Sequence, residues 1–269
     1  MRRIPGKRTV TEPRDPGSRD ALVVGGSRGI GLALTEALLA SGQAGNDSDR
    51  VFVTYRGKIL PASLKALATQ YGQRMQPIRC ELADDTSIAA LGDQLREANA
   101  VLALTLHAAG ILHEDGVKPE KALSQAESTS LMRLFEVNSI APLLVARTVL
   151  PLIPRSGACH FAALSAMVGS IGDNRIGGWY GYRASKAALN QFLKTLAIEA
   201  RRTHPGLCVT SIHPGTTDTD LSKPFQGNVP EKRLYTPEQS AQRILDVVMA
   251  GTPETSGRFM NWNGEPLPW

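Results

Sequence analysis

Apolar and polar positions alternate along this chain in blocks with two different periods. Short, nearly continuous apolar runs predict buried strands at 21–26, 50–56, 77–82, 100–110, 157–165 and 207–215. Longer stretches with apolar residues at helical spacing predict helices at 30–42, 61–71, 129–150, 182–202 and 237–250. Alternating strands and helices predict an α/β fold, a single doubly wound parallel sheet with helices on both faces.

Capping residues indicate where two of the helices begin. Asp84 or Asp85 can cap a further helix that runs to about Asn99, and Thr236 precedes Pro237 as the expected cap of the last helix. Residues 256–264 predict a final short strand. Because no break in composition divides residues 20–269, we expect this range to form one domain. In a parallel sheet of this kind, ligands bind beyond the carboxyl ends of the strands.

The net charge of +5 lies mostly at the N-terminus, where residues 1–19 carry six basic and two acidic side chains. The rest of the chain is nearly neutral and has no basic stripe interleaved with aromatic residues, so we expect no nucleic-acid partner. Three prolines and few apolar residues predict that residues 1–19 form a disordered tail. An organelle-targeting peptide is the alternative, but prolines and acidic residues interrupt the amphipathic helix it requires.

The three cysteines, Cys80, Cys159 and Cys208, lie far apart and show no paired spacing. They predict neither a disulfide framework nor a zinc site, so we expect no metal. A reducing, cytoplasmic location is the simplest inference. No uninterrupted run approaches the roughly 18 apolar residues that cross a bilayer, and we expect no membrane partner.

A glycine motif, GGSRGIG at residues 25–31, separates the first strand from the first helix. Gly25 permits the tight turn, Gly29 lets the backbone approach a pyrophosphate, and Gly31 lets helix and strand pack closely. Free N–H groups at the helix N-terminus favour an anion there. The motif alone is weak evidence, but its place between the first strand and the first helix predicts a nucleotide site.

The end of the second predicted strand bears on the choice between NAD and NADP. An NAD site usually has an acidic residue there for the ribose hydroxyls, but this strand ends at Thr54, Tyr55 and Arg56. Arg56 and Arg28 could flank a 2′-phosphate, which arginine binds through its bidentate fork. The sequence therefore predicts NADP, unless both arginines are simply solvated.

Tyr182 and Lys186 are four residues apart in a predicted helix, which places both side chains on one face. A phenol titrates near pH 10, and a neighbouring ammonium lowers that pKa. The pair is therefore a candidate for acid/base chemistry. Tyr180 lacks such a partner, because Ala184 stands four residues after it.

Together these motifs resemble the short-chain dehydrogenases/reductases, which share a Rossmann fold. The resemblance covers about residues 20–269 and adds His107–Gly110, Asn138, Ser165 and Pro214–Gly215 in the family's order. Residues 169–190 look most like the C-factor and sniffer-like carbonyl reductase branch. The resemblance implies an NADP(H)-dependent oxidoreductase that interconverts a small-molecule carbonyl and an alcohol.

The resemblance also implies roles for individual residues. Tyr182 would be the acid/base, Lys186 would hold the nicotinamide ribose and lower the tyrosine pKa, Asn138 would help hold a relay water, and Ser165 would bind the substrate oxygen. Pro214, Gly215, Thr217 and Thr219 would border the nicotinamide end. The implied cofactor-binding set is Gly25, Ser27, Arg28, Gly29, Ile30, Gly31, Arg56, Glu81, Leu82, Ala109, Gly110, Tyr182, Lys186, Pro214, Gly215, Thr217 and Thr219.

The sequence departs from the family's pattern after two of the strands. His107 stands where the family usually has asparagine, and a structural hydrogen bond is its expected role. A gap-free match would put Ala166 at the usual serine position; we favour Ser165, which ends the strand, over Ser170.

Two other function classes compete with carbonyl reduction. One is a C-factor-like signalling or regulatory protein that binds nucleotide with little turnover. The other is an epimerase or dehydratase, which the short stretch after Gly215 disfavours. We expect residues 220–236 to form a lid over the substrate. We also expect a homodimer or homotetramer that pairs helices 129–150 and 182–202, the latter through Leu189, Phe192, Leu193 and Leu196.

Overall fold

The computed structural model describes residues 19–41, 49–228 and 230–269. The predicted disordered tail lies outside these residues except for Arg19. The backbone N–H of Arg19 donates to Asp49 Oδ1 at 2.7 Å, and its guanidinium donates to the carbonyl of Ala158. Arg19 is therefore attached to the folded body.

A seven-stranded sheet forms the centre of the molecule, with its strands in the order β3-β2-β1-β4-β5-β6-β9. Every neighbouring pair in this sheet is parallel. The order reverses direction between β1 and β4, which creates the crevice where such sheets bind ligands. The strands are β1 Asp20–Val24, β2 Val51–Tyr55, β3 Met75–Arg79, β4 Leu102–His107, β5 Cys159–Leu164, β6 Leu207–His213 and β9 Arg258–Asn261.

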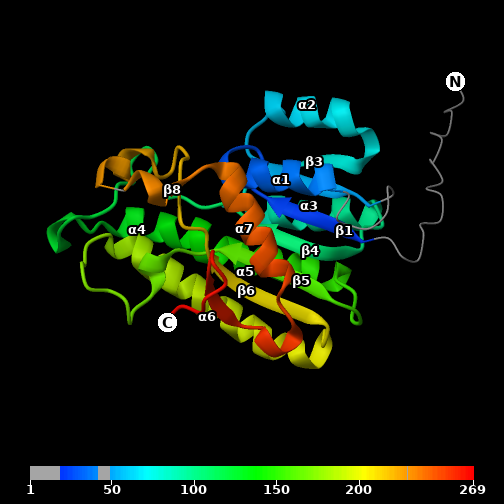
Figure 1. Ribbon diagram of the computed structural model, residues 1–269. Helices are drawn as coiled ribbons and strands as arrows, with labels where there is room; N and C mark the ends of the chain where they lie inside the picture. The colour runs from blue at the N-terminus through cyan, green and yellow to red at the C-terminus, as the bar shows by residue number, and fades with distance from the viewer. Residues whose placement is uncertain (1–18, 42–48, 229) are drawn as a thin grey trace, which may run out of the picture.

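Helices cover both faces of the sheet, as predicted (Figure 1). One apolar cluster joins the sheet to α1 and α7 and includes Leu34 and Ile244; the other joins it to α3, α5 and α6 and includes Leu91 and Leu193. The helices are α1 Gly29–Ser41, α2 Ala62–Tyr71, α3 Asp85–Glu97, α4 Ser128–Phe135, α5 Ala141–Val149, α6 Tyr180–Thr203 and α7 Pro237–Met249.

Helix caps agree with the sequence in two places. The Asp84 carboxylate accepts from the backbone N–H of Thr86 at the start of α3. Thr236 and Gln239 form a reciprocal capping box at the start of α7, with Pro237 in the first turn. Both start sites were therefore readable from local chemistry alone.

Three differences between the predicted and observed elements bear on the site. Strand β3 lies two residues earlier and contains Pro77, which an edge strand tolerates. The helix predicted at 129–150 is α4 and α5 joined by a π-helical turn at Glu136–Ile140. Helix α6 begins at Tyr180, two residues before Tyr182. The shift of β3 matters most, because it places Glu81 beyond the strand end.

Three of the four apolar residues of α6 that were expected to pair subunits are buried within the subunit. Leu189, Leu193 and Leu196 of α6 are buried in the protein's own core. Large exposed apolar side chains lie instead at Met132 in α4, at Ile140 in the π-helical turn and at Ile198 in α6. The apolar surface inferred from α6 is thus mostly used within the subunit.

The helical stretch Ser128–Leu152 is long and apolar enough to cross a membrane by length and composition, with a mean hydropathy of 1.2. The sequence criterion of an uninterrupted apolar run did not identify it. Half of its most apolar window is buried inside the protein, as is usual for a core helix.

Directly after β6 the chain forms a second, two-stranded sheet. Strand β7 Thr216–Thr217 pairs in parallel with β8 Leu234–Tyr235. Between them, Lys223–Asn228 forms a 3₁₀ helix in the segment predicted as a lid. Leu221 and Phe225 of this segment pack against a cluster that contains Tyr182.

Candidate active site

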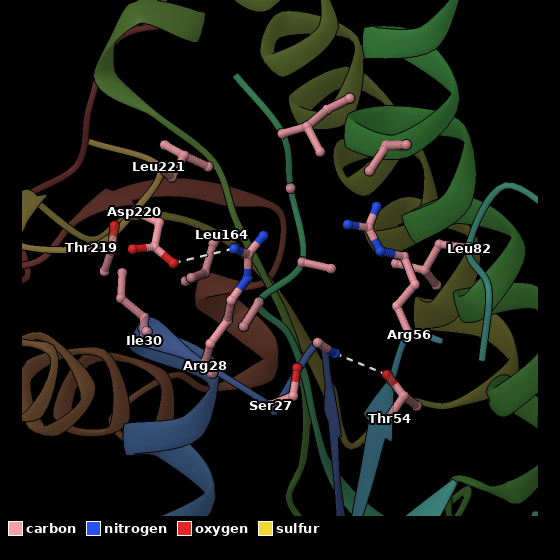
Figure 2. Close-up of a pocket in the computed structure, with 18 of the residues that line it drawn as sticks. Ser27, Arg28, Ile30, Thr54, Arg56, Leu82, Leu164, Thr219, Asp220 and Leu221 are labelled. Atoms are coloured by element: carbon pink, nitrogen blue, oxygen red, sulfur yellow. Dashed lines mark hydrogen bonds and ion pairs between the residues drawn. The ribbon is translucent and has the colours of Figure 1, made fainter. Parts of the chain in front are cut away.

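A cavity of about 400 Å³ lies at the carboxyl ends of the central strands. Figure 2 shows its side chains converging from the glycine turn, the end of β2 and the segment after β7. It is lined by most of the predicted site residues: Gly25, Ser27, Arg28, Gly29, Ile30, Gly31, Arg56, Glu81, Leu82, Ala109, Gly110, Ser165, Tyr182, Lys186, Pro214 and Thr219.

The glycine turn leaves no room for a side chain at Gly25, Gly26 or Gly31. A Cβ on Gly31 would lie 2.1 Å from the carbonyl oxygen of Gly25, so only glycine allows this contact between turn and helix. Gly25 has φ +79° and lies against Ala109, the neighbouring strand's extension. Its N–H donates to Thr54 Oγ1 at 2.8 Å, a contact visible in Figure 2. The turn therefore opens the N-terminus of α1 toward the cavity.

Each of the two predicted phosphate-binding arginines faces an acidic residue. Arg28 Nη1 lies 3.3 Å from Asp220 Oδ2, and Arg56 Nη1 lies 3.7 Å from Glu114 Oε2. Both guanidinium groups are largely exposed at the cavity rim. No acidic residue ends β2, so this rim presents two arginines to a ligand.

Tyr182 and Lys186 both reach the cavity from α6, whereas Tyr180 is largely exposed. Lys186 Nζ donates to the carbonyl oxygen of Leu164 at 2.8 Å and lies 5.8 Å from the centre of the Tyr182 ring. Burial lowers the pKa of Lys186 to about 8. The two residues predicted for acid/base chemistry are therefore buried neighbours.

Burial acts on the pKa of the Tyr182 phenol in the direction opposite to the lowering predicted from Lys186. Burial raises the pKa of the Tyr182 phenol above its ordinary value. The reason is that a phenolate loses its hydration in this enclosed position, and this loss is the dominant effect. At neutral pH the phenol consequently carries its proton.

The two candidate serines differ in what their hydroxyls contact. Ser165 is buried, lines the cavity, and its Oγ has no hydrogen-bond partner within the described residues. Ser170 Oγ accepts from the N–H of Asp173 at 3.1 Å and donates to the carbonyl of Trp269 at 3.3 Å. Ser170 is thus engaged with the C-terminus and does not line the cavity.

Asn138 lies behind the cavity wall and does not line it. Its Nδ2 donates to the carbonyl oxygen of Ile111 and to Ser185 Oγ, and its Oδ1 accepts from the N–H of Ile111. A Cβ on Gly110 would lie 3.2 Å from Asn138 Oδ1 and 3.3 Å from Lys186 Nζ. The amide therefore fixes the loop after β4, and its predicted contact with a relay water stays a prediction.

Two predicted cofactor residues lie outside the cavity lining. The Thr217 hydroxyl is buried and hydrogen-bonds Ser240 Oγ at 2.7 Å. Gly215 has φ +78° and is packed against Tyr235 and Trp262. These contacts hold in place the residues just before the segment 220–236, which was predicted as a lid.

His107 has the buried position expected of a structural residue. Burial, together with the nearby Lys186 charge, lowers the pKa of His107 to about 3, so its ring is neutral. Its Nε2 has no hydrogen-bond partner within the described residues.

Several lining residues escaped sequence reasoning. The rule that ligands bind at strand ends points to four of them, Thr54, Tyr55, Ala108 and Leu164. Of the others, Cys80 directly follows β3, and Asp220 and Leu221 begin the segment predicted as a lid. No local signal marks Ile111 in a loop, Arg133 in α4 or Val137 in the π-helical turn. Within the described residues, no group of three or more His, Cys, Asp or Glu could hold a metal ion.

Comparison with known protein families gives evidence that is independent of this geometry. The family model for short chain dehydrogenases matches residues 19–229. The chain belongs to the short-chain dehydrogenase/reductase family. Its fold, its glycine turn and its enzyme class, an oxidoreductase with a nicotinamide cofactor, are those predicted from the sequence.

Individual relatives place the chain near the predicted branch of short-chain dehydrogenases/reductases. It is 35% identical to 1-hydroxy-2-glutathionyl-2-methyl-3-butene dehydrogenase of Rhodococcus sp., over 70% of this chain and 78% of the relative. It is 32% identical to C-signal of Myxococcus xanthus, over 55% of this chain and 84% of the relative. The NADPH-bound carbonyl reductase from chicken fatty liver has a TM-score of 0.81 and 27% identity, covering 94% of each chain.

Proposed function

We propose that the protein is an NADP(H)-dependent carbonyl reductase that uses Tyr182, Lys186 and Ser165, with Asn138 as a positioning residue. The observation that carries this proposal is that Ser165, Tyr182 and Lys186 line one cavity with the glycine turn and the two arginines. The C-signal relative keeps a signalling role open as the alternative. Residues 20–269 act as one catalytic domain, in a cytoplasmic enzyme.

The cavity fits the nicotinamide nucleotide that the family uses. The glycine turn and the N-terminus of α1 offer free N–H groups to a diphosphate, and Arg28 with Arg56 offers positive charge to a 2′-phosphate. Lys186 would hold the nicotinamide ribose, and Glu81 and Leu82, which line the cavity, would border the adenine. Bound NADPH supplies the hydride.

Tyr182 acts as the general acid in this proposal. The oxygen of a reduced carbonyl develops negative charge, and the buried, protonated phenol of Tyr182 donates a proton to it. Ser165 Oγ, which has no hydrogen-bond partner in the described part of the chain, donates to the same oxygen. The phenol is protonated at neutral pH, as carbonyl reduction requires of its general acid.

The decisive experiment measures NADPH oxidation across a panel of aldehydes, ketones and quinones. The wild-type protein should turn over at least one of these classes. Tyr182→Phe removes one oxygen and keeps the ring, so NADPH should still bind while turnover falls by at least roughly 10²-fold. NADPH binding with no turnover on any carbonyl would favour the signalling alternative, and a fully active Tyr182→Phe would exclude the mechanism.

A further inference from the structure

The helix that carries Tyr182 and Lys186 begins without a cap of its own. Trp179 occupies the N-cap position of α6 with φ 52° and ψ 43°, and its side chain makes no capping hydrogen bond. An indole cannot accept hydrogen bonds from the N–H groups of the first turn. These groups need an acceptor from elsewhere, because a helix leaves its first four N–H groups unpaired.

Glu120 supplies that acceptor from the loop between β4 and α4. Its two carboxylate oxygens lie 3.3 Å and 3.2 Å from the backbone nitrogen of Gly181, which donates to them. The backbone carbonyl of Glu120 accepts a hydrogen bond from the N–H of Trp179 at 2.5 Å. Glu120 is 2% exposed, and its negative charge lies where the helix dipole favours an anion.

The packing around Gly181 keeps this contact in place. A Cβ at this position would lie 2.6 Å from Leu134 Cδ1 and 2.9 Å from Glu120 Oε1, so the helix backbone lies directly against both residues. Gly181 immediately precedes Tyr182. Any movement of its amide moves the phenol as well.

The residues before α6 adopt a conformation that needs support. Gly177, Gly178 and Trp179 all have positive φ, and a bulky aromatic residue is strained there. Arg183 holds the carbonyls of Gly178 and Gly177 at 2.9 Å and 3.1 Å. The N–H of Trp179 itself donates to the backbone carbonyl of Glu120.

We propose that Glu120 is a positioning residue for the general acid, a buried carboxylate that caps α6 from another loop and thereby fixes Tyr182 in the cavity. This inference rests on the proposed role of Tyr182. The carboxylate acts on the Gly181 amide, and through it on the placement of the phenol.

Glu120→Ala and Glu120→Gln provide the first test. Alanine leaves the Gly181 N–H without its acceptor, so kcat should fall about tenfold to hundredfold, as for other small misplacements of a catalytic group. The Kd for NADPH should change less than twofold, because the glycine turn and arginines are untouched. Glutamine keeps an acceptor oxygen at the same reach and should restore most of kcat.

The Tyr182→Phe background separates positioning from general stability. If Glu120 acts through the phenol, Glu120→Ala should change the residual turnover of Tyr182→Phe less than twofold, since coupled residues are not additive. Asp84→Ala is the matched control, because it removes the carboxylate N-cap of α3 and should lower the melting temperature without changing kcat. If Glu120→Ala does not fold, Glu120→Asp, whose shorter carboxylate withdraws from Gly181, takes its place in both backgrounds.

The outcomes distinguish this inference from the proposed function. An equal loss of turnover in the wild-type and Tyr182→Phe backgrounds, or an unchanged kcat in folded Glu120→Ala, would overturn the role of Glu120 alone. Full activity of Tyr182→Phe would overturn both proposals.

Discussion

Arg28 in the glycine turn forms an ion pair with Asp220 across the cavity mouth, with Nη1 3.3 Å from Oδ2 (Figure 2). The two side chains are 69% and 75% exposed, so the pair contributes at most about 1 kcal/mol. Thr219, the residue before Asp220, also lies against the turn, because a Cβ on Gly29 would be 3.1 Å from Thr219 Cγ2. A 2′-phosphate would compete with Asp220 for this guanidinium.

Replacing Asp220 should therefore strengthen NADPH binding. In Asp220→Asn the Arg28 guanidinium loses its carboxylate partner, and the Kd for NADPH should fall by up to about fivefold, with little change for NADH. Fluorescence or calorimetric titration with both cofactors measures this, with Asp218→Asn as a control outside the cavity lining. An equal change for the two cofactors would show that Arg28 does not contact the 2′-phosphate.

The wild-type protein should bind NADPH more tightly than NADH. Arg56→Ala should weaken NADPH binding about tenfold to hundredfold, the range expected for losing a charged hydrogen bond, and leave the Kd for NADH nearly unchanged. Titration of both proteins with both cofactors tests this. Equal wild-type affinities, or a preference for NADH, contradict the assignment of NADP.

The serine assignment makes a paired prediction. Ser165→Ala should lower turnover by roughly 10²-fold or more while sparing NADPH binding, as for loss of a donor to a developing oxyanion. Ser170→Ala should affect stability through Trp269 and Asp173 and leave turnover nearly unchanged. Initial rates and NADPH titrations on the two variants decide the matter. Impairment of Ser170→Ala alone would move the catalytic role to Ser170.

Lys186 should make stability depend on pH. Its pKa is lowered from 10.5 to about 8, so between these values the unfolded state binds more protons than the folded state. Stability therefore rises with pH through this interval, and the burial penalty is fully present below about pH 8. Relative to Lys186→Met, the wild-type free energy of unfolding should rise by about 2 kcal/mol between pH 8 and 10.

Urea denaturation of both proteins at several pH values measures this difference. Because burial raises the pKa of Tyr182, its contribution to stability declines only above pH 10, where the unfolded chain loses the phenol proton. A wild-type stability that runs parallel to that of Lys186→Met from pH 8 to 10 would show that the folded-state pKa is not lowered.

We still expect a homodimer or homotetramer that pairs the predicted helices 129–150 and 182–202, through exposed apolar side chains rather than through the buried leucines of α6. Met132 is 61% exposed in α4 and Ile140 is 43% exposed in the π-helical turn, and both line one shallow groove. Light scattering should show an oligomer at micromolar concentration, and Met132→Glu should shift it toward monomer. Only monomer for the wild type would reject the prediction.

The architecture, and the parts of the site that local chemistry encodes, follow from the amino-acid sequence alone. Buried parallel strands need continuous apolar runs, so the strand and helix order was readable without structure. The glycine turn, the Tyr182–Lys186 spacing and the caps of α3 and α7 are also local, because backbone geometry or helix periodicity fixes each of them.

Which groups meet, and what surrounds each of them, depends on how the elements pack in three dimensions. Trp269, far away in sequence, engages the Ser170 hydroxyl, whereas the Ser165 hydroxyl lines the cavity. The raised pKa of Tyr182 depends on burial by neighbouring elements, which helix spacing does not reveal. The contact of Glu120 with Gly181 joins residues 61 positions apart. Burial and long-range contacts arise from packing, and no spacing along the chain encodes them.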